Sequence, residues 1–379
     1  MAASFWLAAV FVGYTYLGYP LLIAAAAFLR PLPPRRLPGF TPSVTVLLVV
    51  NDEEDALAGK LDNLLALDYP PERIEIVVVS DGSRDGTDAI ATSYASRGVR
   101  LLSFPGPRGK ASCLNDSVPQ TRSDLLVLTD VRQPLAADAV AALASYFHDP
   151  NVGAVSGELH LHRPAGTGVA GVGVYWNYEK LIRRAESSFD STVGVTGAFY
   201  ALRRELFSPL DPRTILDDVA LPMEIVLRGR RVLFAPEAGA HDQIADKGSR
   251  EYKRKTRTLA GNYQLVALRP ALLDPRKNRL FWQFTSHKLA RLLVPWALLL
   301  AFVASLALSL EGQPFYTLAL GAQFAFFGLA ALGALFARRS PPPRLLALPY
   351  TFCLLNLAAL GGLLGFLRGR ETANWRKRA

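Results

Sequence analysis

Two adjacent carboxylates, Asp217 and Asp218, stand between apolar neighbours in the segment ILDDV. The residues that follow, 221–227, have the apolar pattern of a helix, so we expect the pair at a helix N-terminus. One aspartate is enough to cap a helix there, and such a cap contributes about 1 kcal/mol. A second carboxylate beside it is typical of a general base that accepts a proton from a substrate hydroxyl. The pair alone leaves both roles, cap and base, open.

Apolar runs at 44–50, 74–79 and 124–129 each end on polar residues. Runs of this kind are typical of buried parallel strands, and the first two are about 30 residues apart, which is the length of a strand–helix–strand unit. Open α/β sheets bind ligands at the carboxyl ends of their strands. Although aspartates can merely cap turns, we therefore expect a nucleotide site formed by the residues at these ends and at the start of the next helix: Asn51, Asp52, Asp81, Lys110 and Asp130.

Two further pairs of residues are less specific indicators of a binding site. Arg254 and Arg257 are three residues apart, on one face of a predicted helix, where they could bind a pyrophosphate or lie against lipid. His160 and His162 share one face of a strand expected at 151–161, and could form a metal pair. Since no third ligand is near them in the sequence, a solvent-facing polar pair is the favoured interpretation.

Half of the 379 residues are hydrophobic, and they are concentrated at the two ends of the chain. Residues 5–29 form an apolar run that lacks a basic leader and is too long for a signal peptide, so a membrane anchor is predicted. Three more spans are expected near 292–310, 315–336 and 345–367, after an interfacial helix at 280–293.

The net charge of +10 comes largely from basic residues that flank these apolar segments. This distribution favours contact with membrane lipids over nucleic acid, for which no motif is present. It also predicts an N-terminus outside and a cytoplasmic catalytic domain, in a multi-pass protein of the inner membrane. We expect an anchor and basic linker at 1–38, an α/β domain at 39–274, and the interfacial helix and spans at 275–379.

Taken together, these motifs resemble those of the membrane-bound, inverting nucleotide-sugar glycosyltransferases of family 2, which include cellulose, chitin and hyaluronan synthases. The matching elements are NDE at 51–53, SDGSRDGT at 80–87, GK at 109–110 with Asn115, and DD at 217–218. The resemblance implies a Rossmann-like GT-A domain with a mostly parallel sheet. It further implies a UDP-sugar donor whose uracil contacts Asp81, a lipid-linked or polymeric glycan acceptor, and Asp218 as the catalytic base beside Asp217.

The chain departs from the family pattern at two places. The metal-binding Asp-x-Asp is Asp130-Val131-Arg132 here, so a site for Mg²⁺ or Mn²⁺ at Asp130 would lack its second carboxylate. We expect Arg132 to contact the diphosphate and to weaken the metal requirement. The Gln-x-x-Arg-Trp of processive synthases appears as RKTRT at 254–258, without Gln or Trp. Two alternatives follow: a polyprenyl-phosphate sugar transferase, or a membrane protein that binds nucleotide sugars without catalysis.

Overall fold

The computed structural model describes residues 1–162, 170–243, 248–337 and 342–369. Its centre is a seven-stranded sheet with the order β3-β2-β1-β4-β6-β5-β7. The strands β3, β2, β1 and β4 are parallel, β6 is antiparallel to both of its neighbours, and β5 and β7 are parallel. The bounds are β1 Val44–Val50, β2 Ile74–Asp81, β3 Val99–Phe104, β4 Leu125–Thr129, β5 Val152–His162, β6 Phe199–Arg203 and β7 Arg231–Gln243.

The central strands are buried on both faces, as their continuous apolar runs predict. All seven residues of β1 are buried. Val46 and Leu48 pack into one core layer, whereas Leu47 and Val49 pack into the other. This alternation follows from the two-residue period of a strand. The predicted α/β domain with a mostly parallel sheet is therefore confirmed.

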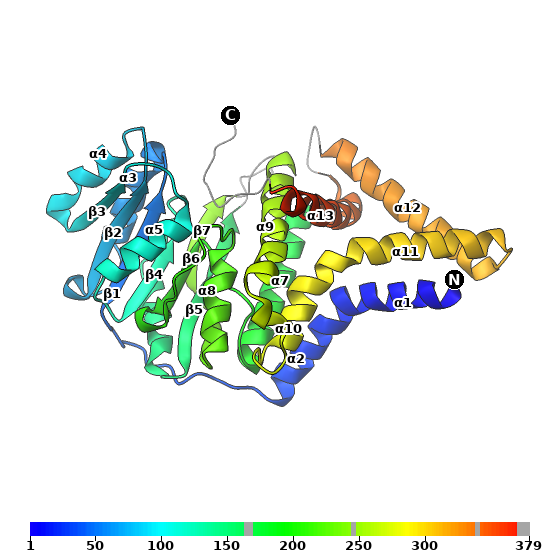
Figure 1. Cartoon of the computed structure of the whole chain (residues 1–379), viewed down its shortest axis with the longest axis horizontal. Helices are drawn as coiled ribbons and strands as arrows, with labels where there is room; N and C mark the ends of the chain where they lie inside the picture. Colours follow the sequence, from blue (N-terminus) through cyan, green and yellow to red (C-terminus); the bar gives the residue numbers. More distant parts are fainter. Residues whose placement is uncertain (163–169, 244–247, 338–341, 370–379) are drawn as a thin grey trace.

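Helices cover both faces of this sheet (Figure 1). Within the described residues these are α3 Glu54–Leu65, α4 Thr87–Ser93, α5 Lys110–Ser117, α6 Ala139–Ser145, α7 Ala170–Phe189 and α8 Asp217–Leu227, whereas α9 Gly248–Leu268 lies farther from the sheet (Figure 1). The parallel strands β1, β2 and β4 all end at the same edge of the sheet, where the predicted polar residues begin. That edge is the one at which open α/β sheets bind ligands.

Among the described residues, four helical segments are long and apolar enough to cross a membrane: Ala2–Leu29, Phe281–Leu310, Pro314–Phe336 and Arg344–Leu367. The first consists of α1 Ala2–Gly13, a π-helical turn at Tyr14–Gly18 and α2 Tyr19–Leu29, and the others contain α10 Phe281–Phe284, α11 Ala290–Leu310, α12 Pro314–Phe336 and α13 Arg344–Leu367. Figure 1 shows them on the side of the molecule away from β3, with α7 and α9 between them and the sheet.

The second span differs from its predicted form. An interfacial helix was expected at 280–293, separate from the following span. Instead α10, a π-helical turn at Thr285–Leu289 and α11 are continuous, so the same helical segment contacts the catalytic domain and then enters the apolar region. The basic residues at 288 and 291, which suggested an interfacial position, face the catalytic domain rather than lipid.

The turn after β2 requires a glycine. Gly82 has φ +67, and a Cβ at this position would lie 2.4 Å from the backbone of Gly106. The turn thereby packs directly against the loop that precedes α5. Because both segments are backbone at this contact, neither can move aside as a flexible side chain would.

We predict that Gly82→Ala destabilises the protein more than Gly98→Ala does. Gly98 also has a positive φ of +87, but a Cβ there would meet no atom within 4 Å. Its substitution should cost only the conformational strain of about 1–2 kcal/mol, whereas Gly82→Ala adds an overpacking term of about 1–3 kcal/mol. Chemical unfolding of the detergent-solubilised protein measures both. Equal losses would show that the Gly106 contact relaxes freely.

Candidate active site

Asp81 is fully buried at the end of β2, and it fixes the loop before α5. Its Oδ1 accepts a hydrogen bond from the Arg108 amide at 2.8 Å, and its Oδ2 accepts one from the Gly109 amide at 2.7 Å. The Asn51 side chain donates to the Asp81 carbonyl at 2.8 Å. The carboxylate therefore joins the ends of β1 and β2 to the start of α5. A contact with uracil would have to share oxygens that already accept two backbone hydrogen bonds, and it remains a prediction.

The neighbouring turn is held by reciprocal contacts between the segments after β1 and β2. Asp52 has φ +53, and its Oδ1 accepts a hydrogen bond from the Arg84 amide at 2.8 Å. The Glu54 carboxylate accepts one from the Gly86 amide at 2.6 Å, while the Glu54 amide donates to Asp85 at 3.2 Å. The motifs at 51–53 and 80–87 thus form one structural unit, which agrees with their predicted positions at the ends of adjacent strands.

Lys110 connects the strand-end residues to the paired aspartates. Its Nζ lies 3.3 Å from Asp130 Oδ1 and 3.3 Å from Asp217 Oδ2. Burial disfavours the charged ammonium, but the carboxylates of Asp217 and Asp130 raise the pKa of Lys110 above its ordinary value. The Tyr200 hydroxyl of β6 also donates to Asp217 Oδ2, at 3.4 Å. Three segments that are distant in the sequence thus meet at one ammonium group.

Asp218 is the second residue of α8 and lies against the loop between α7 and β6. Its carbonyl accepts a hydrogen bond from the Val195 amide at 2.9 Å, and a Cβ on Gly197 would lie 3.0 Å from its Oδ2. Gly197 thus permits a close backbone approach beside the candidate base.

The electrostatic environment of Asp218 suits a proton acceptor. Burial and then the neighbouring carboxylate of Asp217 raise the pKa of Asp218 to about 6. Three cations oppose the shift: Lys288, Lys110 and Arg183. A carboxyl group with this pKa is ionised at neutral pH, yet it binds a proton more readily than an exposed aspartate does.

Asp130 and Arg132 lie on the turn after β4. The Asp130 side chain is 44% exposed, and that of Arg132 is 74% exposed, 3.9 Å from Glu53. Buried Lys60 supports the turn, because its Nζ donates to Thr129 Oγ1 at 3.0 Å and to the Gln133 carbonyl at 2.5 Å. Burial lowers the pKa of Lys60 to about 7, although Asp130 opposes this.

The predicted phosphate-binding residues Arg254 and Arg257 are exposed on α9. A role for them at a pyrophosphate stays a prediction.

His160 and His162 meet a third histidine that sequence proximity could not reveal. His241 comes from β7, and its Nδ1 lies 2.7 Å from His162 Nε2. The His241 ring stacks on both β5 rings, with centroids 5.4 and 5.0 Å apart. The three rings are thus layered rather than convergent, and no group of three or more metal-ligating side chains occurs among the described residues. The parallel pairing of β5 with β7 is what assembles the stack.

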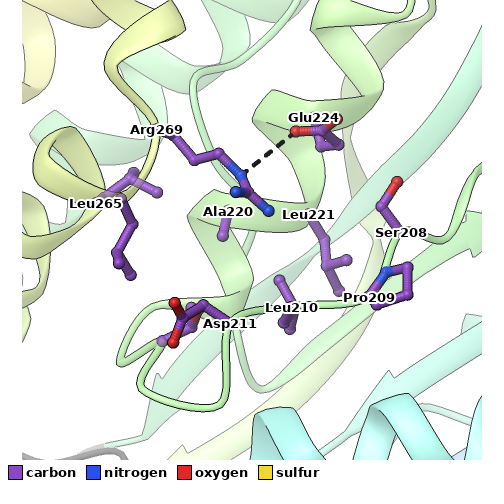
Figure 2. A pocket seen from close by; sticks show the side chains of 11 residues that line it. Ser208, Pro209, Leu210, Asp211, Ala220, Leu221, Glu224, Leu265 and Arg269 are labelled. Carbon is purple, nitrogen blue, oxygen red and sulfur yellow. Dashed lines mark ion pairs between the residues drawn. The ribbon is translucent and has the colours of Figure 1, made fainter.

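A pocket beside α8 is separate from the aspartate pair (Figure 2). It lies between the 208–214 loop, one side of α8 and the end of α9, and Arg269 pairs with Glu224 across it at 3.7 Å. Asp217 and Asp218 belong to the first turn of the same helix, but they do not line this pocket. The charged edge at Lys110, rather than this pocket, is therefore the candidate active site.

Comparison with known proteins identifies the family of this chain. Residues 42–261 match the family model described as "Glycosyltransferase like family 2". The poly-beta-1,6-N-acetyl-D-glucosamine synthase of Staphylococcus aureus (strain MSSA476) is 25% identical over 229 residues, covering 59% of this chain and 55% of that protein. The probable glycosyltransferase YdaM of Bacillus subtilis (strain 168) is 24% identical over 240 residues, covering 59% and 56%. The matches thus span little more than half of these relatives.

A solved structure extends the likeness to the membrane helices. The mannosyltransferase PcManGT from Pyrobaculum calidifontis, in complex with GDP-Man and Mn²⁺, superposes with a TM-score of 0.76 at 23% identity. The match covers 97% of this chain and 100% of that one. It shows that the predicted GT-A fold is correct. The family match covers more than half of the chain, so this protein belongs to glycosyltransferase family 2 and is a membrane-associated glycosyltransferase with a GT-A domain.

Proposed function

We propose that this enzyme transfers a sugar, with inversion, from a nucleoside diphosphate sugar to a lipid-linked or polymeric glycan acceptor at the membrane surface, and that Asp218 is the general base. The observation that carries this proposal is the environment of the aspartate pair. Asp217 is bound by Lys110, whereas Asp218 has a raised pKa. Two adjacent carboxylates are thus placed in different electrostatic states, which separates an ion-paired residue from a proton acceptor.

The donor would bind along the carboxyl edge of the parallel strands. The predicted nucleoside residues Asn51, Asp52 and Asp81 lie at one end of this edge, and Lys110 and Asp130 lie nearer to the aspartate pair. This order supports a nucleotide sugar whose base lies near β2 and whose diphosphate lies near Lys110, and we propose a UDP-sugar as this donor. A GDP-sugar complex of the structural relative PcManGT supports a nucleotide-sugar donor in general.

A divalent metal has one exposed carboxylate available in this site. Asp130 could hold Mn²⁺ or Mg²⁺ shared with the diphosphate, although both Asp130 and the nearby Asp217 already contact Lys110, and Asp217 is the less exposed of the two. A bound metal would neutralise charge on the leaving diphosphate. The donor set fits a metal held jointly with substrate and does not fit one held by protein alone. Lys110 and Arg132 are the cations that this chain supplies for the same purpose, with Arg254 and Arg257 as candidates on α9.

In the proposed reaction Asp218 accepts the proton of an acceptor hydroxyl. The hydroxyl oxygen then forms a bond to the anomeric carbon from the face opposite the diphosphate. The bond from that carbon to the diphosphate oxygen breaks, and its electron pair leaves with the nucleoside diphosphate. The positive charge of Lys110 stabilises the departing group. The spans and the basic linker after Leu29 support a catalytic domain on the cytoplasmic face of the inner membrane.

We predict that Asp218→Asn abolishes transfer but preserves nucleotide binding. Removal of a general base typically slows a reaction by about 10²–10⁴-fold. In the wild type, activity should fall as the pH decreases through about 6, since Asp218 must be ionised. Rates measured against pH test both statements, and UDP calorimetry controls for folding. A variant that retains more than about a tenth of the wild-type rate would identify Asp218 as a helix cap.

Asp81→Ala should instead weaken donor binding. The substitution removes the acceptor of the Arg108 and Gly109 amides and so releases the loop that precedes Lys110. We expect loss of the calorimetric UDP signal. Asp85→Ala is the matched control on the same turn, because the hydrogen bonds that Asp85 accepts among the described residues come from the amides of Glu54, after β1, and Thr87, and not from the loop that precedes Lys110. If both variants bind UDP as the wild type does, Asp81 has no part in donor binding.

Arg132 should determine how strongly activity depends on a metal. Two like charges about 4 Å apart repel by roughly 4 kcal/mol at an effective dielectric constant of 20. The arginine therefore disfavours a metal at Asp130 unless the diphosphate lies between them. Arg132→Asp should increase the dependence on added Mn²⁺ or Mg²⁺, whereas Arg132→Ala should slow transfer at every metal concentration. Full activity of Arg132→Ala with an unchanged metal titration would make Arg132 a surface residue only.

A further inference from the structure

Two cationic side chains approach Asp218 from the side of the molecule that carries the membrane helices. Arg183 belongs to α7, and its Nη1 donates to Thr196 Oγ1 at 2.7 Å. Lys288 belongs to the π-helical turn that begins the second span. A Cβ on Gly194 would lie 3.8 Å from Lys288 Nζ and 3.4 Å from the Asp218 carbonyl. Both cations therefore border the same 194–197 loop that contacts the candidate base.

Neighbouring cations on the same helices each have a carboxylate partner. Lys180 and Arg184, which flank Arg183 on α7, both bind Glu158, at 2.6 and 3.0 Å. Arg291, one turn after Lys288, binds Glu179. Among the described residues, neither Arg183 nor Lys288 has a carboxylate oxygen within 4.0 Å. Both are only partly exposed. Asp218 attracts both cations, and Glu179 attracts Lys288, but neither cation has the direct ion-pair partner that its neighbours have.

The adjacent residues hold Lys288 in this position. His287 is buried between two carboxylates of α7, with Nδ1 2.8 Å from Glu186 and Nε2 3.1 Å from Glu179. Tyr19 of the first span donates to Glu186 at 2.5 Å. Burial opposes ionisation of both glutamates, yet His287 lowers the pKa of Glu186, and Arg291 and His287 together lower that of Glu179. Two spans and α7 are thus bound together at the point where Lys288 enters the site.

We propose that Arg183 and Lys288 form a binding subsite for the phosphoryl group of a lipid-linked acceptor. This inference rests on the proposed function and names the chemical class of its acceptor. A neutral glycan would leave both cations without a direct ion-pair partner, whereas a phosphate accepts charge-assisted hydrogen bonds from both an arginine and a lysine. The start of a membrane span is also the depth at which lipid head groups lie.

Two kinds of acceptor contain such a phosphoryl group. In a prenyl monophosphate, an ionised phosphate oxygen attacks the anomeric carbon, and no proton needs to be removed. In a prenyl diphosphate-linked sugar, a hydroxyl attacks and gives its proton to Asp218. In both reactions the bond between the anomeric carbon and the donor diphosphate breaks, and its electron pair leaves with the nucleoside diphosphate.

The test uses the full-length protein in phosphatidylcholine nanodiscs, with farnesyl phosphate and farnesol as binding probes. The wild type should bind farnesyl phosphate at least about tenfold more tightly than farnesol. Arg183→Gln and Lys288→Gln should each weaken the binding of farnesyl phosphate by about tenfold, and Lys288→Arg should retain most of the wild-type affinity. Arg184→Gln is the matched control, since Arg184 is on the same helix but is paired with Glu158, and it should bind as the wild type does.

Transfer assays with a UDP-sugar then distinguish the two acceptors, by comparing farnesyl phosphate with farnesyl diphosphate-linked N-acetylglucosamine.

Equal binding of farnesyl phosphate and farnesol would overturn the inference, as would unchanged binding in Arg183→Gln and Lys288→Gln or an equal loss in Arg184→Gln. Calorimetry with UDP distinguishes a failure of the proposed subsite from a failure of the proposed function. If the wild type binds and uses a nucleotide sugar but shows no phosphate selectivity, only the subsite is wrong; if it binds no nucleotide, the proposed function fails.

Discussion

The site depends on one partly buried ammonium group. Lys110 lies between Asp130, at the end of β4, and Asp217, at the start of α8. Without a cation between them, two carboxylates in a partly buried site would repel each other and at least one would take up a proton. The lysine therefore allows the parallel half of the sheet and the second half of the domain to bring their acidic residues together. Asp218, the next residue along α8, is outside this ion pair and has the raised pKa.

The membrane helices contribute to this arrangement as well as to anchoring. The helical segment Phe281–Leu310 begins against the catalytic domain, where His287 and Arg291 bind carboxylates of α7. Removing one partner of a buried ion pair of this kind destabilises a protein, because the other partner is left as an unpaired buried charge. The spans and the domain are consequently difficult to separate. An active site that includes Lys288 would be incomplete in a soluble fragment that ended before this segment.

The sequence predicted the parts of the fold that depend on local pattern. The apolar runs located β1, β2 and β4, and the polar residues after them do meet at one edge, since parallel strands place their carboxyl ends together. The antiparallel β6 and the long β7 were not predicted, because their pairing depends on partners far along the chain. His241 was missed for this reason. Lys60 and Lys288 were missed because a lysine that follows a helical pattern looks the same whether it is solvated or buried.

The cations on either side of Asp218 link its affinity for a proton to the binding of the donor. Lys110 lies on the donor side and Lys288 on the membrane side, and each lowers the pKa of Asp218. A diphosphate bound to Lys110 brings negative charge close to the carboxylate and partly cancels the effect of that lysine. Asp218 then binds a proton more readily than in the empty site. In the proposed reaction, the strength of Asp218 as a base is therefore coupled to donor binding, and an acceptor hydroxyl would be activated most strongly when a leaving group is already in place.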